Sequence, residues 1–372
     1  MKRKSGALVA LTVAGALALT ACGGGREGTT DPTAEGTEGT EGEVAEAGFA
    51  EDAVIGVSLP WLGTQNWAEA EQMFTEELSA AGFEPLVQAA DNKVPQQQQQ
   101  IEAMIERGAE VIVVGPIDGT QLGSVLEKAQ AEGIAIIGYD RLIENTEAVD
   151  AVVQFGSIRT GELQGQSLLD GLAERKGEPP YNIELFGGGP ADPNAPNFFT
   201  GAMSVLQPKI DDGTLVVVSG QTDFTQAATP DWDNGKAQAR MDSLLSGFYA
   251  DKEIDGVLSP NDGIARAIMT SAQQAGQEIP VVTGLDAENE SVISVWEGKQ
   301  WSTVAKPTQD LVARTIELIQ ALQRGEELPA ADEMVDNGKK DVTVYQLPPV
   351  VVTQENAEEV FANDPARLDL LK

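Results

Sequence analysis

The sequence predicts an α/β fold made of two lobes, each containing a doubly wound, mainly parallel sheet. From residue 53 onwards, apolar runs typical of strands alternate with amphipathic stretches typical of helices. Repeated strand–helix units with short connections form parallel sheets with helices on both faces. The alternation restarts after residue 155 and continues beyond the length at which a single core stops growing. We therefore expect two similar lobes rather than one large sheet.

The clearest strand is the apolar run at residues 134–139, with Asp140 and Arg141 directly after it. A continuous apolar run is typical of a strand that is buried on both faces of a parallel sheet. Ligands of open α/β sheets bind beyond the carboxyl ends of the strands. Asp140 and Arg141 are therefore candidate binding residues, although a local ion pair or a helix start would also explain them.

The other elements of the first half follow in regular order. Strands are expected at residues 54–59, 83–89, 111–114 and 152–155, and helices at residues 67–81, 95–107 and 121–132. Gly82 ends the first of these helices. Pro95 and the glutamines at 96–100 precede apolar residues at helical spacing, so they form the exposed start of a helix rather than a low-complexity segment.

The second half repeats the pattern. Helices are expected at residues 158–174, 197–206, 235–249, 264–275, 291–298 and 310–324, and strands at residues 182–186, 215–218, 256–258, 281–284, 302–305 and 344–352. Pro348 and Pro349 interrupt the last strand. The segment between residues 324 and 344 is polar and carries no predicted element.

The first fifty residues have the composition of a leader and a tether. Basic residues precede an apolar run at 7–19, which is too short to span a membrane and is typical of a secretory signal. The tetrapeptide 19–22 resembles the lipobox of bacterial lipoproteins, which would make residues 1–21 a signal peptide and Cys22 the lipidated first residue. An ordinary signal peptide is the alternative. Residues 22–50 are rich in Gly, Glu and Thr, and predict an acidic flexible tether.

Composition excludes several functions. The net charge is −35, from 59 acidic and 24 basic residues, which argues against nucleic acid as a partner. The chain has no histidine and only one cysteine. It therefore lacks the residues for Ser-His-Asp or Cys-His catalysis and for an ordinary zinc site, and it can form no internal disulfide. We expect no cofactor and no metal.

Polar and aromatic residues follow the other strands as well. The candidates, besides Asp140 and Arg141, are Asn66, Trp67, Asn194, Trp232, Asn261, Asp286 and Lys306. Trp61 and Asp192 lie in the same loops, but the sequence does not fix their orientation. Each residue has another explanation when it is taken alone: Asn261 and Asp286 are good helix N-caps, the tryptophans could be core residues, and Lys306 could be solvated.

Taken together, these side chains suit a neutral ligand that is rich in hydroxyl groups. Carboxylates, carboxamides, one Arg and one Lys can pair with a ring of hydroxyls, and indole faces can cover the apolar faces of a pyranose. The glycines at 187–189 lack the lysine and the spacing of a phosphate-binding loop. A sugar-acting hydrolase that uses Asp140 and Asp286 is an alternative.

Several motifs resemble those of one family. They are I-D-G-T at 117–120, Y-D-R-L-I-E-N at 139–145, N-I-E-L-F-G-G at 182–188, G-A-M-S-V-L at 201–206, A-Q-A-R-M-D at 237–242 and V-L-S-P-N-D-G at 257–263. They resemble the sugar-binding proteins of ABC importers. The resemblance implies a type I periplasmic-binding-protein fold with a three-strand hinge. Residues 53–155 and 307–343 would form the N-terminal lobe, and residues 156–306 and 344–372 the C-terminal lobe.

The resemblance also implies the function and the roles of the candidates. The protein would be a monomer, lipid-anchored outside the cell membrane, that delivers a monosaccharide of the xylose, glucose, galactose or arabinose class to an ABC permease. Asp140 and Arg141 would hold hydroxyls and the ring oxygen, while Trp67 and Trp232 would stack on the sugar. The remaining candidates would complete the polar ring. Asn66 stands where the xylose binders have an arginine. A sensing receptor that partners a signalling protein remains an alternative.

Overall fold

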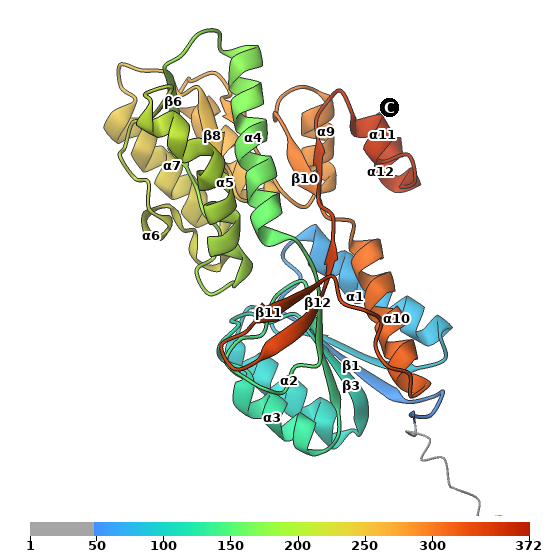
Figure 1. The fold of residues 1–372 in the computed structure, drawn as a ribbon. Helices are drawn as coiled ribbons and strands as arrows, with labels where there is room; N and C mark the ends of the chain where they lie inside the picture. The colour runs from blue at the N-terminus through green and yellow to red at the C-terminus, as the bar shows by residue number, and fades with distance from the viewer. Residues whose placement is uncertain (1–47) are drawn as a thin grey trace, which may run out of the picture. The chain divides into compact units, whose positions relative to one another are not determined.

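The computed structural model describes residues 48–372. Its larger sheet has seven strands in the order β11-β12-β5-β4-β3-β1-β2, and all neighbouring pairs are parallel except β11 with β12. The strands are β1 (Val54–Leu59), β2 (Glu84–Ala89), β3 (Ala109–Val114), β4 (Ala135–Tyr139), β5 (Ala151–Phe155), β11 (Glu333–Asp336) and β12 (Asp341–Leu347). This sheet confirms the predicted α/β class (Figure 1).

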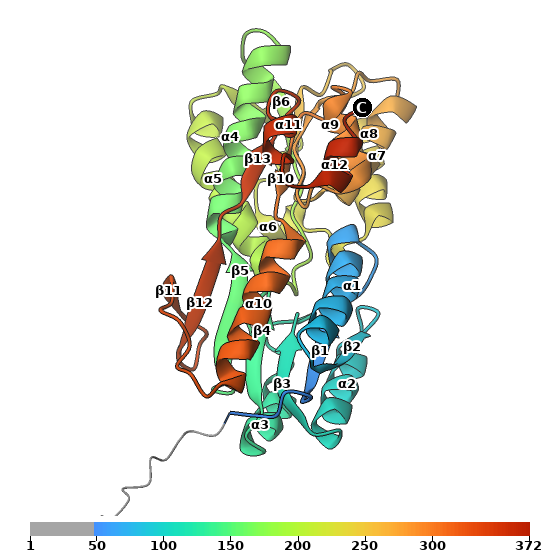
Figure 2. The same ribbon diagram turned by 90° about the vertical axis from the view of Figure 1, so that its right-hand side faces the viewer.

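Helices cover both faces of the larger sheet. They are α1 (Gln65–Ala80), α2 (Val94–Glu106), α3 (Gly123–Ala131) and α10 (Thr308–Gln323). Val111 and Val113 of β3 point to the apolar cluster under α1 and α10, whereas Ile112 and Val114 point to the cluster under α2 and α3. Successive side chains of a strand face opposite sides, so this strand must be apolar throughout. Figure 2 shows α1 and α10 in front of the strands.

The second sheet has four parallel strands in the order β7-β6-β8-β9, with β10 and β13 forming a separate antiparallel pair. The strands are β6 (Tyr181–Leu185), β7 (Leu215–Val217), β8 (Gly256–Leu258), β9 (Val281–Val282), β10 (Thr303–Ala305) and β13 (Val350–Val352). The helices are α4 (Ser157–Arg175), α5 (Asn194–Asp211), α6 (Phe224–Ala227), α7 (Asn234–Phe248), α8 (Asp262–Gln274), α9 (Asn289–Trp296), α11 (Ala357–Val360) and α12 (Pro365–Asp369).

Close packing of α4 against α5 fixes the start of α5. A Cβ atom on Gly161 would lie 1.9 Å from the carbonyl oxygen of Phe198, and one on Gly201 would lie 2.1 Å from that of Ile158. Backbone cannot move away as a flexible side chain can, so only glycine allows this approach. The contact places Asn194, the first residue of α5, beside the chain segment that follows β4.

The chain passes between the two sheets in three places, namely after β5, after β10 and after β12. We retain the two-lobe division as a proposal, with these segments as the hinge. The expected boundary between residues 343 and 344 falls inside the continuous strand β12, so we move it to residues 348–349. None of the helices in residues 48–372 is long and apolar enough to cross a membrane. The expected signal peptide, Cys22 and most of the tether lie outside the described residues.

Candidate functional site

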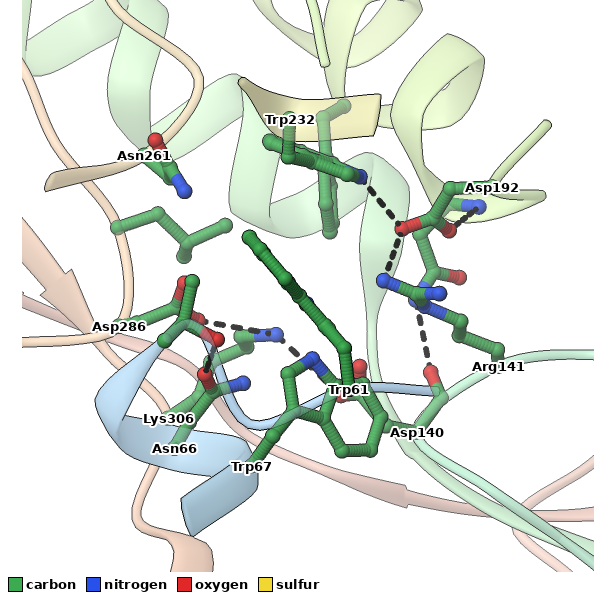
Figure 3. Close-up of a pocket in the computed structure, with 14 residues that line it drawn as sticks. Trp61, Asn66, Trp67, Asp140, Arg141, Asp192, Trp232, Asn261, Asp286 and Lys306 are labelled. Carbon is green, nitrogen blue, oxygen red and sulfur yellow. Dashed lines mark hydrogen bonds and ion pairs between the residues drawn. The ribbon is translucent and has the colours of Figure 1, made fainter. Parts of the chain in front are cut away.

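One cavity is lined by residues that follow strands of both sheets (Figure 3). It is lined by all nine candidates predicted from the sequence: Asn66, Trp67, Asp140, Arg141, Asn194, Trp232, Asn261, Asp286 and Lys306. Most of them follow the carboxyl ends of β4, β6, β8, β9 and β10, while Asn66 and Trp67 lie in the first turn of α1. Parallel strands end at the same edge of their sheet, which explains how loops far apart in the sequence meet here.

Lys306 lies between Asp140, which follows β4, and Asp286, which follows β9. Its Nζ lies 3.2 Å from Oδ1 of Asp140 and 3.3 Å from Oδ1 of Asp286, and all three side chains are at most 10% exposed. Burial lowers the pKa of Lys306, but the two carboxylates outweigh it and raise the pKa above its usual value. Burial raises the pKa of Asp286, and Lys306 partly offsets this effect.

A second ion pair lies on the opposite side of the cavity. Nη2 of Arg141 lies 2.7 Å from Oδ2 of Asp192, and Nε1 of Trp232 donates a hydrogen bond to the same oxygen at 3.1 Å. Burial raises the pKa of Asp192, although Arg141 lowers it in part. The Nε of Arg141 is buried and has no hydrogen-bond partner among the described residues. A buried donor without a partner is costly, so this part of the site carries an unsatisfied polar atom.

Three site residues have left-handed backbone angles. The φ angles of Asp140, Trp232 and Asp286 are 62°, 54° and 88°. Residues with a Cβ atom adopt this conformation at a cost of roughly 1–2 kcal/mol. Backbone hydrogen bonds from Asp140 to Val153 (2.8 Å) and from Asp286 to Val304 (2.9 Å) hold the strained residues in place. The protein itself therefore holds the backbones of Asp140 and Asp286 in these strained conformations.

The two asparagines have different surroundings. Asn194 donates to the carbonyl oxygen of Asp140 at 2.7 Å and accepts from Ser157 at 2.9 Å, so most of its amide is engaged within the protein. The Oδ1 of Asn261 caps α8 by accepting from the backbone of Ile264 at 3.0 Å. Figure 3 shows the amide nitrogen of Asn261 pointing toward the cavity. The capping role is therefore confirmed, and it leaves the nitrogen available to a ligand.

The three tryptophans that line the cavity differ in how much of the ring they present to it. Trp67 is 3% exposed, and the guanidinium of Arg141 lies over its ring, 5.1 Å from the centroid. Trp67 therefore belongs mainly to the hydrophobic core and presents only part of its surface to the cavity. Trp61 projects across the cavity, and Trp232 lines its far side (Figure 3). Trp61 and Trp232 offer the larger aromatic surfaces.

Comparison with known proteins decides the family. The model of the periplasmic binding protein domain matches residues 55–327. The chain belongs to this family. It is 43% identical over 324 residues to the multiple sugar-binding periplasmic receptor ChvE of Rhizobium radiobacter, with 86% of this chain and 92% of the relative covered. It is 31% identical over 319 residues to the D-xylose-binding periplasmic protein of Escherichia coli K12, with 86% and 92% covered.

Solved structures of the family agree with the fold. An ABC transporter solute-binding protein of Clostridium phytofermentans with bound β-D-glucose has a TM-score of 0.81 and 36% identity, covering 86% of this chain and 100% of that one. These matches confirm the expected periplasmic-binding-protein fold and the resemblance seen in the motifs. Membership of this family makes the chain a binding protein rather than an enzyme, so the hydrolase alternative is set aside.

The cavity of this periplasmic binding protein also contains residues beyond the nine candidates. They are Trp61, Thr64, Asp192, Phe198 and Leu285. Trp61 and Asp192 could be located in the right loops from the sequence, but their directions could not. Phe198 is part of the helical pattern of α5, and Leu285 is a single apolar residue between Gly284 and Asp286. Neither carries a sequence signal that separates it from the core.

The glycines at 187–189 have a structural role that their sequence did not reveal. A Cβ atom on Gly188 would lie 2.2 Å from Cη2 of Trp232, so the indole packs directly on the glycine backbone. We expect Gly188→Ala to displace Trp232 into the cavity and to weaken ligand binding about 10-fold, the effect of losing roughly 1.4 kcal/mol. Calorimetric titration measures this effect.

Gly247→Ala is the matched control, because a Cβ atom there meets nothing within 4 Å. It should leave the affinity unchanged. Equal affinities for wild type and Gly188→Ala would show that the contact between Trp232 and Gly188 does not affect ligand binding.

Asp262 lies behind the site and predicts a pH dependence. Burial, with Glu288 as the next cause, raises the pKa of Asp262 to about 8, although hydrogen bonds from Gln300 and from the backbone of Glu288 lower it in part. A carboxyl whose pKa is raised on folding supports the fold fully below its unfolded value of about 3.9. That support is lost as the pH rises through about 8. We expect the unfolding free energy to fall between about pH 4 and about pH 8, and to fall less in Asp262→Asn. Urea unfolding at several pH values measures this difference. Parallel stability curves for the two proteins would contradict the assignment.

Proposed function

We propose that the protein is an extracytoplasmic receptor that binds one monosaccharide in this cavity. The observation that carries the proposal is the pairing of every charged side chain in the site. Lys306 lies between Asp140 and Asp286, and Arg141 lies against Asp192. An ionic ligand would have to compete with these pairs, whereas a neutral ligand with several hydroxyl groups can add hydrogen bonds to the unused donors and acceptors.

The aromatic surfaces of the cavity support a sugar ring as the ligand. Trp61 and Trp232 can cover the apolar C–H faces of such a ring, while the polar residues reach its edge.

The relatives support an aldose of the glucose or xylose type. The relative from Rhizobium radiobacter is named for binding multiple sugars, and that from Escherichia coli for binding D-xylose. The solved structure from Clostridium phytofermentans contains β-D-glucose. A second solved structure, from Chloroflexus aurantiacus, is a complex with D-glucose, with a TM-score of 0.77 and 33% identity, covering 85% of this chain and 97% of that one. We propose D-glucose, D-xylose, D-galactose and L-arabinose as the ligands to test.

The proposed mechanism is closure of the two lobes followed by delivery to an ABC importer. A sugar that touches residues from both lobes has more contacts in the closed form than in the open one, so binding shifts the population toward closure. Solved relatives described as ABC transporter solute-binding proteins support the transport role. The lipobox at residues 19–22 supports a lipid on Cys22 that keeps a monomeric receptor at the outer face of the cell membrane.

A thermal-shift panel of aldoses tests the proposal. A ligand at 100 times its dissociation constant adds about 2.7 kcal/mol to the free energy of unfolding. At least one of the four sugars should therefore raise the melting temperature by several degrees. Sorbitol, a hydroxyl-rich sugar alcohol without a ring, should raise it far less. A panel without any shift at millimolar sugar would refute a monosaccharide receptor.

A further inference from the structure

The C-terminal helix α12 carries Arg367, whose guanidinium group contacts three separate segments. Its Nη1 lies 2.8 Å from Asp364, the residue that caps the same helix. Its Nε donates to the carbonyl oxygen of Ala287 at 3.0 Å. Its Nη2 lies 3.2 Å from both carboxylate oxygens of Glu69 in α1. One side chain therefore joins the end of the chain to two distant segments.

The contact with Glu69 crosses from one proposed lobe to the other. Leu371, just after α12, packs in an apolar cluster with Ala305 of β10 and Val352 of β13. Helix α1 instead contributes to the core of the seven-stranded sheet. Figure 2 shows α12 above the end of α1 at which the helix begins, where Glu69 lies. The Arg367–Glu69 pair thus bridges two bodies that the hinge allows to separate.

A second crossing lies beside the first. The Oε1 of Gln65 accepts a hydrogen bond from the backbone nitrogen of Asn289 at 2.7 Å, and the Nε2 of Gln65 donates to Glu69 at 2.6 Å. Gln65 and Glu69 are one helical turn apart on α1, so both crossings use the same face of this helix. The two contacts form one small network at the edge of the site.

Both ends of this network adjoin ligand-binding candidates. Glu69 lies one turn after Asn66 and just after Trp67 on α1. Ala287 follows Asp286 directly, and its φ angle of 49° is left-handed like that of its neighbour. Arg367 therefore holds the segments that carry candidates from both lobes, without itself lining the cavity.

The pair is buried enough to matter energetically. The side chain of Arg367 is 13% exposed and that of Glu69 is 23% exposed, whereas most other ion pairs among residues 48–372 are far more exposed. Pairs at exposed positions contribute little, because water and salt screen them. A largely desolvated pair that exists only in the closed form stabilises that form alone.

We propose that Arg367 is a positioning residue that latches the two lobes together by pairing with Glu69, and that this latch sets how long the ligand is retained. The inference rests on the proposed function, because it assigns the C-terminal helix a part in closure over the sugar. The latch exists only in the closed form, so it shifts the balance between the open and closed forms with or without ligand. It therefore acts on dissociation, while association is governed by the open form.

A double-mutant cycle on sugar binding tests the latch. Glu69→Gln and Arg367→Gln should each raise the dissociation constant for D-glucose about 5- to 10-fold, through a faster dissociation rate with an unchanged association rate. The double variant should be little worse than either single one, because both changes remove the same interaction. Glu317→Gln is the matched control, because it removes the same charge from a pair with Arg314 within α10.

Two outcomes separate the latch from the proposed function. Normal sugar affinity in both single variants, or effects that simply add in the double variant, would overturn the latch and leave the receptor proposal intact. If the wild type binds no aldose, the receptor proposal fails, and nitroxide labels then decide the latch. For these, Glu132→Cys and Lys252→Cys are made in a Cys22→Ser background. The latch predicts longer label-to-label distances in the double variant than in the wild type, and identical distances would overturn it.

Discussion

Arg141→Ala should weaken sugar binding more than any other single change in the cavity. The substitution removes a charged donor group that lines the cavity, and it leaves Asp192 buried without a counter-charge. A hydrogen bond from a charged group to the ligand is worth about 1.5–3 kcal/mol. The dissociation constant should therefore rise by roughly 10- to 150-fold. Calorimetric titration with the best-bound aldose measures this change.

Two further variants serve as controls for the Arg141→Ala measurement. Arg107→Ala removes an arginine from an exposed pair with Glu84 and should leave the affinity unchanged. Arg141→Lys retains the charge but loses the planar fork, so its affinity should lie between those of wild type and Arg141→Ala. Wild-type affinity in Arg141→Ala would show that this side chain does not contact the ligand.

Lys306→Met should lower the stability of the protein at neutral pH. It leaves Asp140 and Asp286 buried with no cation between them, and breaking a buried pair costs about 3–5 kcal/mol. Burial already raises the pKa of Asp286, and loss of Lys306 removes the charge that lowers it. Urea unfolding measures the deficit relative to the wild type.

The deficit should depend on pH in a defined direction. A carboxyl whose pKa is raised on folding supports the fold below its unfolded pKa of about 3.9 and opposes it as the pH rises through the folded value. The variant should therefore be close to wild type near pH 4 and fall behind it toward pH 7. Lys128→Met, at an exposed pair with Glu102, should show no deficit. An equal deficit at all pH values would mean that packing, not charge, is lost.

The sequence predicted most of the sheet and of the site because both depend on local patterns. Residues 134–139 are apolar without interruption, which identifies a strand buried on two faces, and the polar residues after it then point to the ligand edge. The same logic located Asn261 and Lys306. Residues brought together by parallel strands can be found without knowing the fold in detail.

Other features depend on contacts that no local pattern encodes. Arg141 pairs with Asp192, and Trp61 crosses the cavity, because loop backbones set these directions. Trp67 turns into the core because of the way α1 packs on the sheet. The strand β11 was missed because its sequence, Glu-Met-Val-Asp, is short and half polar, and pairing with β12 supplies its stability.

The C-terminal helices were missed for a similar reason. The helix α12 spans only Pro365–Asp369, too short for a periodic signal. Arg367 of this helix contacts Glu69, which is 298 residues away in the sequence. Interactions of that range appear only once the tertiary structure is known.

A crystal structure of the protein grown with D-glucose, or with the aldose that raises its melting temperature most, shows whether this cavity is the sugar site. We expect one sugar ring in the cavity, with hydroxyl oxygens within hydrogen-bond distance of Asp140, Asn261 and Arg141. A sugar bound elsewhere on the molecule, with this cavity filled only by water, would contradict it.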